Sequence, residues 1–422
     1  MRGDEREMGG ANRERGLGPL GVWTLLVCSS LTVMAGAIVS PVLPVLAEIY
    51  KAEANAALMT RLVITMPALA IALTGALAGL LADRIGPERV LVASLALYAV
   101  AGTTGAYLDD LDALLAGRFG LGLGVAGLMA SIGAIIANRY AGEARTKLFG
   151  RQSAFMAAGG VVFLPLGGAL SQVSHQAPFT VYAASLLMIP LVMASLMARR
   201  QPTLRPGAGG DAKLSGGTSR PTNSGDPSSN KPGQRSLAPV VALAIWFQII
   251  FYLGPVQAPF LVKERFAASP MIASVCVAVM TLSAAVVSLN YARLARGRNS
   301  PVVAGVTGLA MGIGAVVSGL GGHLAIVIAG QVILGAGAGL IMPNLMGWAA
   351  RLSTPTTRGR AAGVLTAGIF AGQFLSPIVL QPIVSTRGVG AAFAMAGACS
   401  VVGGVVLLMM ALRPRVHRAA IG

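Results

Sequence analysis

Twelve separate stretches of this 422-residue chain are apolar over about 20 residues each, the length that an α-helix needs to cross a bilayer. Backbone N–H and C=O groups find no partner in lipid, so each stretch must be helical. Only 11% of the residues are charged, which excludes a soluble enzyme or a disordered chain. The sequence therefore predicts an all-α integral membrane protein. We place its spans at 20–43, 59–82, 89–108, 112–137, 149–171, 178–198, 238–261, 271–292, 301–320, 324–347, 361–383 and 389–412.

The basic residues gather on one side of these spans. With the N-terminus inside, the cytoplasmic segments hold 26 of the 32 Lys and Arg residues, and the outer side holds five, namely Lys51, Arg61, Lys263, Arg265 and Arg387. This asymmetry predicts that both termini are cytoplasmic, and we expect the inner membrane of a bacterium. The basic charge is spread over seven segments rather than one face, so we do not expect nucleic acid as a partner.

The longest polar stretch lies halfway along the chain. Residues 199–237 are rich in Gly, Pro and Ser and cannot bury enough apolar surface to order themselves. The expected organisation is a cytoplasmic tail (1–19), a six-helix bundle (20–198), a flexible cytoplasmic linker (199–237), a second six-helix bundle (238–412) and a second cytoplasmic tail (413–422).

The two halves resemble each other at an offset of 213 residues. Matching pairs include Gly117 with Gly330, Arg118 with Gln331, Gly122 with Gly335, Gly124 with Gly337, and Met129 with Met342. Parallel repeats in a membrane protein indicate two bundles that rock about a central site, which is the design of a transporter. The repeat alone leaves a channel open as an alternative.

The loop after the second span reads Gly79-Leu-Leu-Ala-Asp83-Arg84-Ile-Gly86-Pro-Glu-Arg89. It resembles the loop signature of the major facilitator superfamily, in which Gly, Asp, Arg, Gly and a basic residue keep this spacing. The resemblance implies that Asp83 contacts a helix N-terminus and charged partners in the other half, and so latches the outward-facing state. A carboxylate gains energy near a helix N-terminus, in agreement with that role. Alternatively, the loop is only a solvated turn.

The fourth span carries Arg118 followed by glycines that include Gly122 and Gly124. This pattern is similar to the R-x-x-x-G-x-G motif of the same superfamily. Small residues allow helix backbones to approach closely in lipid, and a charge inside a span must face protein or water. Arg118 is therefore a candidate for substrate binding or coupling. Alternatively, its side chain extends to the outer interface near Asp112, Asp110 or Asp109.

Other motifs resemble the drug:proton antiporter branch of the superfamily. Span one ends in Pro41-x-x-Pro44, and spans five and ten contain Pro and Gly residues at candidate packing or hinge positions. These are Pro165, Gly167 and Gly168 in span five, and Gly335, Gly337 and Gly339 in span ten. Span five departs from the branch signature, because Leu164 precedes the proline and one residue is missing before the glycine pair.

No acidic residue lies at the midpoint of a span. If protons drive transport, the candidate carriers are Asp112 with Arg118, Glu48, or Asp83. The polar residues near the midplane are neutral: Gln248, Tyr252, Gln331 and Gln373. Each amide could also simply bridge helices. With Arg118, these groups suit a neutral or anionic organic molecule better than a cation.

We expect a proton-coupled exporter of a small organic compound, such as a drug or secondary metabolite, that works by alternating access between two six-helix bundles of the major facilitator fold. The alternatives are a proton-coupled uptake symporter for a small metabolite and a non-transporting receptor or scaffold. The expected partners are the substrate, the lipid bilayer and protons. We expect a monomer, no cofactor, no metal site and no enzymatic activity.

Overall fold

The computed structural model describes residues 17–53, 55–197, 236–354 and 357–412, and every element in these ranges is helical. Eleven of the described segments are long and apolar enough to cross a membrane. The last, α17 (Arg358–Leu412), has 55 residues and contains Gly388, whose φ of 82° and ψ of 169° are not helical. A straight helix of that length would extend about 80 Å, against a hydrocarbon layer of about 30 Å. Gly388 divides α17 into two crossings, and the predicted all-helical, twelve-span fold is confirmed.

The first half contributes six crossings. The first joins α2 (Pro19–Ala37), a 3-10 turn (Ser40–Val42) and α3 (Leu43–Ile49); the next four are α4 (Ala56–Ile85), α5 (Pro87–Gly102) with a 3-10 turn (Thr103–Ala106), α6 (Leu111–Arg139) and α7 (Gly142–Val173). The sixth crossing joins α8 (Ala177–Thr180), a 3-10 turn (Val181–Leu187), α9 (Met188–Val192) and a π turn (Met193–Met197).

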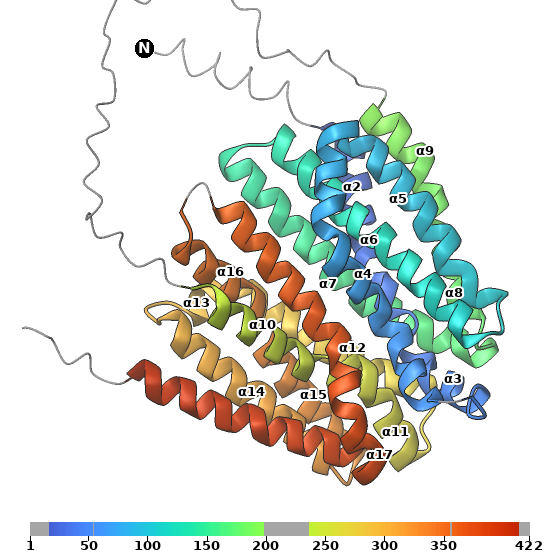
Figure 1. The fold of residues 1–422 in the computed structure, drawn as a ribbon, viewed down its shortest axis with the longest axis vertical. Coiled ribbons are helices and arrows are strands. Elements are labelled where there is room, and N and C mark those ends of the chain that lie inside the picture. Colours follow the sequence, from blue (N-terminus) through green and yellow to red (C-terminus); the bar gives the residue numbers. More distant parts are fainter. Residues whose placement is uncertain (1–16, 54, 198–235, 355–356, 413–422) are drawn as a thin grey trace, which may run out of the picture.

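The second half begins with α10 (Ala238–Phe251), a π turn (Leu253–Gln257) and α11 (Ala258–Phe266). It continues with α12 (Pro270–Leu289), the short α13 (Tyr291–Leu294), α14 (Ser300–Leu320), α15 (Leu324–Ala338), α16 (Ile341–Leu352) and α17. The two halves form two groups of helices that lie side by side, blue to green and yellow to red in Figure 1. The expected linker 199–237, apart from its last two residues, lies outside the described residues, as do most of the two expected tails.

Glycines bring the helices of both halves together in the same way. A Cβ on Gly122 of α6 would lie 2.5 Å from the Pro67 carbonyl oxygen of α4, and one on Gly335 of α15 would overlap the Met280 carbonyl oxygen of α12. Each residue of the second pair lies 213 positions after its counterpart. Gly124 packs against Tyr98 of α5, and Gly337 packs against Met311 of α14, again with each residue 213 positions after its counterpart. The repeated sequence therefore builds a repeated packing.

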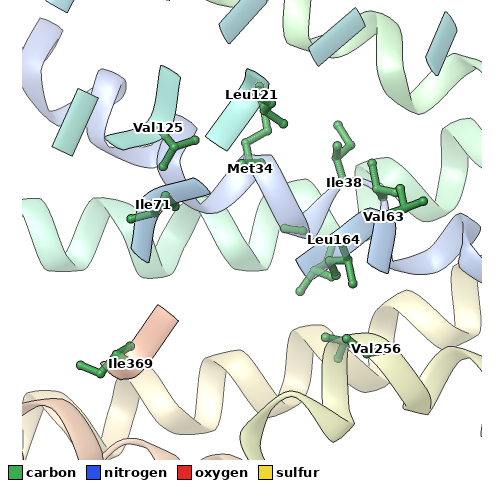
Figure 2. Close-up of a cluster of buried hydrophobic side chains, with 14 of the residues drawn as sticks. Met34, Ile38, Val63, Ile71, Leu121, Val125, Leu164, Val256 and Ile369 are labelled. Carbon is green, nitrogen blue, oxygen red and sulfur yellow. The ribbon is translucent and has the colours of Figure 1, made fainter. Parts of the chain in front are cut away.

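The core of the first bundle forms where α2, α4 and α6 meet. Figure 2 shows Met34 and Ile38 close to Val63 of α4 and Leu121 of α6, and all four are nearly inaccessible to solvent. Val256 and Ile369, also buried, belong to the second bundle on the other side of the same view. We call the end of the molecule at the turn between α4 and α5 the Asp83 end, and the end at which α3 finishes the Glu48 end.

Candidate functional site

The first and seventh crossings are interrupted at equivalent places, and the interruptions touch. α2 ends at Ala37 before the turn Ser40–Val42, and α10 gives way to the π turn Leu253–Gln257. Each turn contains a proline, Pro41 or Pro255, which has no N–H to continue a helix. The Ser40 hydroxyl donates to the Pro255 carbonyl oxygen at 2.5 Å. The interrupted segments thus join the two bundles directly.

A second contact between the bundles centres on Arg61 of α4. Its Nε donates to Gln257 Oε1 at 2.9 Å, its Nη1 donates to the Ala57 carbonyl oxygen, and its guanidinium lies 4.0 Å from the centre of the Phe260 ring. The side chain is only 4% exposed. Arg61 lies inside α4, and its aromatic and amide partners in the second bundle bury it, so it is a gate residue rather than a loop charge. Its position on the outer side stays a prediction.

Lys263 of α11 makes the remaining polar contacts between the bundles. Its Nζ donates to the Pro44 carbonyl oxygen at 3.1 Å and lies 3.8 Å from the Glu48 carboxylate. A pocket of about 640 Å³ opens beside these groups and is lined by residues of both bundles, including Glu48, Arg61 and Glu264. Within the described ranges, every hydrogen bond and ion pair between the two bundles lies between the Ser40–Pro255 contact and the Glu48 end. We call this set of contacts the Glu48-end gate.

The predicted latch loop lies at the other end and makes no such contact. Asp83 and Arg84 are exposed, and the ion pairs among the described residues are Arg139–Glu88, Lys147–Glu143 and Lys263–Glu48. Gly86 ends α4 with a φ of 97°, a conformation that favours glycine. Arg89 Nη1 reaches the Ile85 carbonyl oxygen at 3.5 Å, and a Cβ on Gly79 would meet no atom within 4 Å.

Arg118 is fully buried inside the first bundle. Its Nε donates to the Val63 carbonyl oxygen at 2.8 Å, its Nη1 donates to the Tyr182 hydroxyl at 2.9 Å, and its Nη2 donates to the Ala35 carbonyl oxygen. Two of these carbonyls lack a backbone partner because their helices are interrupted. The Val63 carbonyl would accept from the N–H of residue 67, but Pro67 has none, and the Ala35 carbonyl lies in the last turn of α2, beyond which the helix has no further N–H.

Asp112 does not pair with Arg118. It is exposed in the first turn of α6, beside Asp110, whose carboxylate accepts from the Ala113 N–H at 2.7 Å. Six residues along a helix correspond to about 9 Å of rise and to different faces. The interpretation of Arg118 as a side chain that extends to the outer interface near Asp112 is therefore wrong, because carbonyls of α2 and α4 hold the guanidinium in the interior.

Three of the four predicted neutral polar residues meet. The Tyr252 hydroxyl donates to Gln373 Oε1 at 2.8 Å, and Gln373 Nε2 donates to Gln248 Oε1 at 3.4 Å, so that α10 and α17 are joined. Gln331 stands apart from this amide cluster: its Nε2 donates to Ser318 at 3.2 Å, and its buried Oε1 has no hydrogen-bond partner among the described residues. The cluster belongs to the second bundle, whereas Arg118 belongs to the first.

The two predicted glycines of span five pack against different bundles. A Cβ on Gly167 would overlap the Ile38 carbonyl oxygen of the first bundle, and one on Gly168 would lie 2.6 Å from the Ser274 hydroxyl of the second. Pro165 lies within α7, and Pro44 lies in the first turn of α3. A Cβ on Gly339 would overlap the Ala284 carbonyl oxygen of α12.

Sequence reasoning missed the gate residues Arg61, Gln257 and Lys263. A signal for the first two was present, since Arg61 falls inside the predicted span 59–82 and Gln257 inside 238–261. Charged or amide side chains inside a span face protein or a cavity by default, which predicts a shared interior position. What the sequence does not contain is the pairing, because the partners are 196 residues apart.

The comparisons with known proteins agree with this architecture. The sequence profile of the Major Facilitator Superfamily matches residues 25–258 and 237–421. The class E tetracycline resistance protein of Escherichia coli is 27% identical over 371 residues, which cover 85% of this chain and 86% of that protein. The class C tetracycline resistance protein of Escherichia coli is 29% identical over 321 residues, which cover 72% and 74%.

Solved structures of similar fold include a peptide transporter in complex with sulfate, with a TM-score of 0.75, 15% identity and coverage of 93% of this chain and 94% of that one. A bacterial homologue of the human lysosomal transporter Spinster, in an inward-facing and occupied conformation, has a TM-score of 0.68, 17% identity and coverage of 92% and 94%. The family profile covers nearly the whole chain, and the twelve crossings in two repeated halves extend over the same residues. This multi-pass membrane protein, a transporter rather than an enzyme, therefore belongs to the Major Facilitator Superfamily.

Proposed function

We propose that this chain exports a small organic compound across the membrane by proton-coupled alternating access. The observation that carries the proposal is the one-sided closure of the interface. The contacts of Ser40, Arg61 and Lys263 join the bundles toward the Glu48 end, while Asp83 at the opposite end is exposed. A protein that alternates between two closures needs such a set of contacts at one end at a time.

The direction of transport is proposed from the relatives. Two tetracycline resistance proteins match most of this chain. A membrane transporter gives resistance most simply by export of the toxic compound, so export is the direction that these similarities support.

The proposed substrate is neutral or anionic. Gln248, Tyr252 and Gln373 offer amide and hydroxyl groups but no charge, and no acidic residue lies at the midpoint of a span. A buried cation would need a carboxylate partner, because an unpaired charge in a low dielectric is costly. Neutral hydrogen-bonding groups bind neutral polar molecules without that cost.

The proposed orientation follows the basic residues. With both termini in the cytoplasm of a bacterium, the Glu48 end faces outward and the described conformation is closed to the outside. Opening of the Glu48-end gate would accompany closure at the Asp83 end, where Asp83 and Arg84 would contact the second bundle. Of the three proposed proton carriers, Glu48 is the one that contacts the opposite bundle, through Lys263. Because one chain supplies both bundles, a single copy can form and open this gate, and we propose that the protein works as a monomer.

Transport into inverted membrane vesicles tests the function. A panel of neutral, anionic and cationic compounds is offered with and without an imposed proton gradient. Gradient-driven accumulation of neutral or anionic compounds is expected. Accumulation of cations alone would contradict the proposed substrate class, and no gradient dependence would contradict proton coupling.

Uptake is the second candidate, because a peptide transporter is among the structures of similar fold. The same assay in right-side-out vesicles separates the two. Accumulation there, driven by an inwardly directed proton gradient, would show symport and would overturn export.

A further inference from the structure

The two bundles differ at one pair of equivalent helix ends. In the first bundle, Arg139 in the last turn of α6 forms an ion pair with Glu88 in the first turn of α5, with 3.0 Å between Nη2 and Oε1. Both side chains are about three-quarters buried, since their side-chain exposures are 26% and 25%. This ion pair joins α6 to α5 at the Asp83 end.

The second bundle has an arginine close to the equivalent position but no carboxylate: the residue 213 positions after Arg139 is Leu352, and Arg351 directly precedes it. Arg351 occupies the last turn of α16, and its Nη2 donates to the Ser300 hydroxyl at the start of α14. The residue 213 positions after Glu88 is Pro301. Between residues 238 and 412 the only acidic residue is Glu264, which lies at the Glu48 end. Arg358 and Arg360 follow Arg351 closely in the sequence, and Arg293, Arg296 and Arg298 precede α14; all five are exposed and add positive charge. The bundle therefore supplies no anion to Arg351.

A pocket of about 1270 Å³ opens beside Arg351, between α10, α14, α16 and the end of α17. Its lining includes the polar residues Asn299, Ser300 and Arg351 and the apolar residues Trp246, Trp348, Leu352, Leu407 and Met410. Trp246 and Met410 are exposed, at 36% and 66%. Trp246 lies about 200° around α10 from Gln248, so the pocket faces away from the amide cluster.

We propose that this pocket binds one anionic phospholipid, with the phosphate on Arg351 and an acyl chain along the apolar walls. The start of α14 adds a helix N-terminus to the lining, which favours a phosphate group. A basic pocket between membrane helices binds the anionic headgroup of a phospholipid, and an apolar wall beside it contacts the acyl chain. The phosphate would occupy the place that the Glu88 carboxylate takes in the first bundle. This lipid site is separate from the amide cluster and would bind its lipid whichever substrate is transported.

Native mass spectrometry of the full-length protein in detergent tests the proposal, with phosphatidylglycerol and phosphatidylcholine as probes. One phosphatidylglycerol should stay bound under conditions that remove phosphatidylcholine. Arg351→Gln should weaken the binding of phosphatidylglycerol about fivefold, the factor expected for one basic residue at an anionic membrane surface. Arg360→Gln, at an exposed arginine outside the pocket lining, is the matched control and should leave binding unchanged.

Met410→Trp provides a second variant that keeps the charge and fills the pocket. It should also remove the retained lipid, so the test survives if Arg351→Gln fails to fold. Equal retention of the two lipids would overturn the proposal, as would retention that neither variant changes. Displacement of the lipid signal by millimolar inorganic phosphate alone would also overturn it, because the site would then bind a free anion rather than a lipid.

Discussion

Arg118 is a buried arginine whose acceptors within the described ranges are carbonyl and hydroxyl oxygens rather than a carboxylate. Where a helix is interrupted, some of its carbonyl groups have no backbone N–H to accept from. Burial of such a carbonyl without any donor would cost free energy. The Arg118 guanidinium therefore donates to carbonyl groups of both α2 and α4 where their helical hydrogen bonding is interrupted. It also stabilises the interruption of span one that contacts the second bundle.

Replacement of Arg118 should destabilise the first bundle more than removal of its hydroxyl partner. Arg118→Leu removes the Arg118 donor from the Val63 carbonyl and one of two donors from the Ala35 carbonyl, which also accepts from the Tyr182 hydroxyl at 2.9 Å. The change should lower the free energy of unfolding by at least about 2 kcal/mol. Tyr182→Phe removes one hydroxyl and should lower it by about 1 kcal/mol. Denaturant unfolding in detergent measures both. Arg89→Leu at an exposed site is the control, and an equal effect of all three changes would contradict this role.

Tyr252 is the residue of the amide cluster that can be altered most conservatively. Tyr252→Phe removes only the hydroxyl that donates to Gln373, so the rate of transport should fall about fivefold or more while folding is retained, as expected for the loss of a hydrogen bond worth about 1 kcal/mol. Gln381→Leu, an amide of α17 outside the cluster, is the matched control. Equal transport by both variants in the vesicle assay would show that the cluster only bridges helices.

At the scale of helices, the glycine rows determine how closely α6 and α15 approach their neighbours. Gly122 and Gly335 pack against the backbones of α4 and α12, where no side chain fits, whereas Gly133 on α6 has no atom within 4 Å of an added Cβ. Helix association in lipid depends on such close contact, because lipid supplies no hydrophobic driving force between helices.

Alanine substitutions should separate these two kinds of glycine. Gly122→Ala forces the Pro67 backbone to move and should lower the free energy of unfolding by about 1–3 kcal/mol, whereas Gly133→Ala should raise it by up to about 1 kcal/mol through helix propensity. Thermal unfolding of the two variants in detergent gives the comparison. Stabilisation by both would mean that α4 and α6 can separate without cost.

At the scale of the whole molecule, the gate near Glu48 is held by few polar contacts around Arg61 and Lys263. Few contacts suit a gate that must open in every cycle, since each extra buried contact would add to the barrier. Gln257 also keeps a buried Nε2 without a hydrogen-bond partner in the described ranges, so the closed gate is incompletely satisfied.

Weakening of the gate should expose the interface. In a variant that lacks the exposed Cys399, we introduce Val256→Cys at a position that is fully buried. Adding Arg61→Gln should speed labelling of Cys at 256 by a membrane-impermeant maleimide severalfold, because the contacts with Gln257 and Phe260 are lost. Lys51→Gln, in the same pocket lining, is the control. Unchanged labelling would show that Arg61 does not hold the gate closed.

The sequence by itself determined the helical crossings, the duplication and the family. Apolar runs of 20 residues and the 213-residue offset are local or periodic properties, and lipid leaves a backbone no alternative to the helix. It also indicated that Gln248 and Tyr252 share a face, because they are four residues apart on one helix.

Only the tertiary structure decided which distant residues meet. Arg118 does not contact Asp112, because its guanidinium donates to the carbonyl groups that Pro67 and the end of α2 leave without a backbone N–H. Arg61 contacts Gln257 because the two bundles pack against each other, and Arg139 contacts Glu88 because the ends of α6 and α5 meet. Arg351 donates to Ser300, where α16 meets the start of α14. Side-chain pairing across long sequence separations carries no local pattern, so it emerges only when the helices are placed in space.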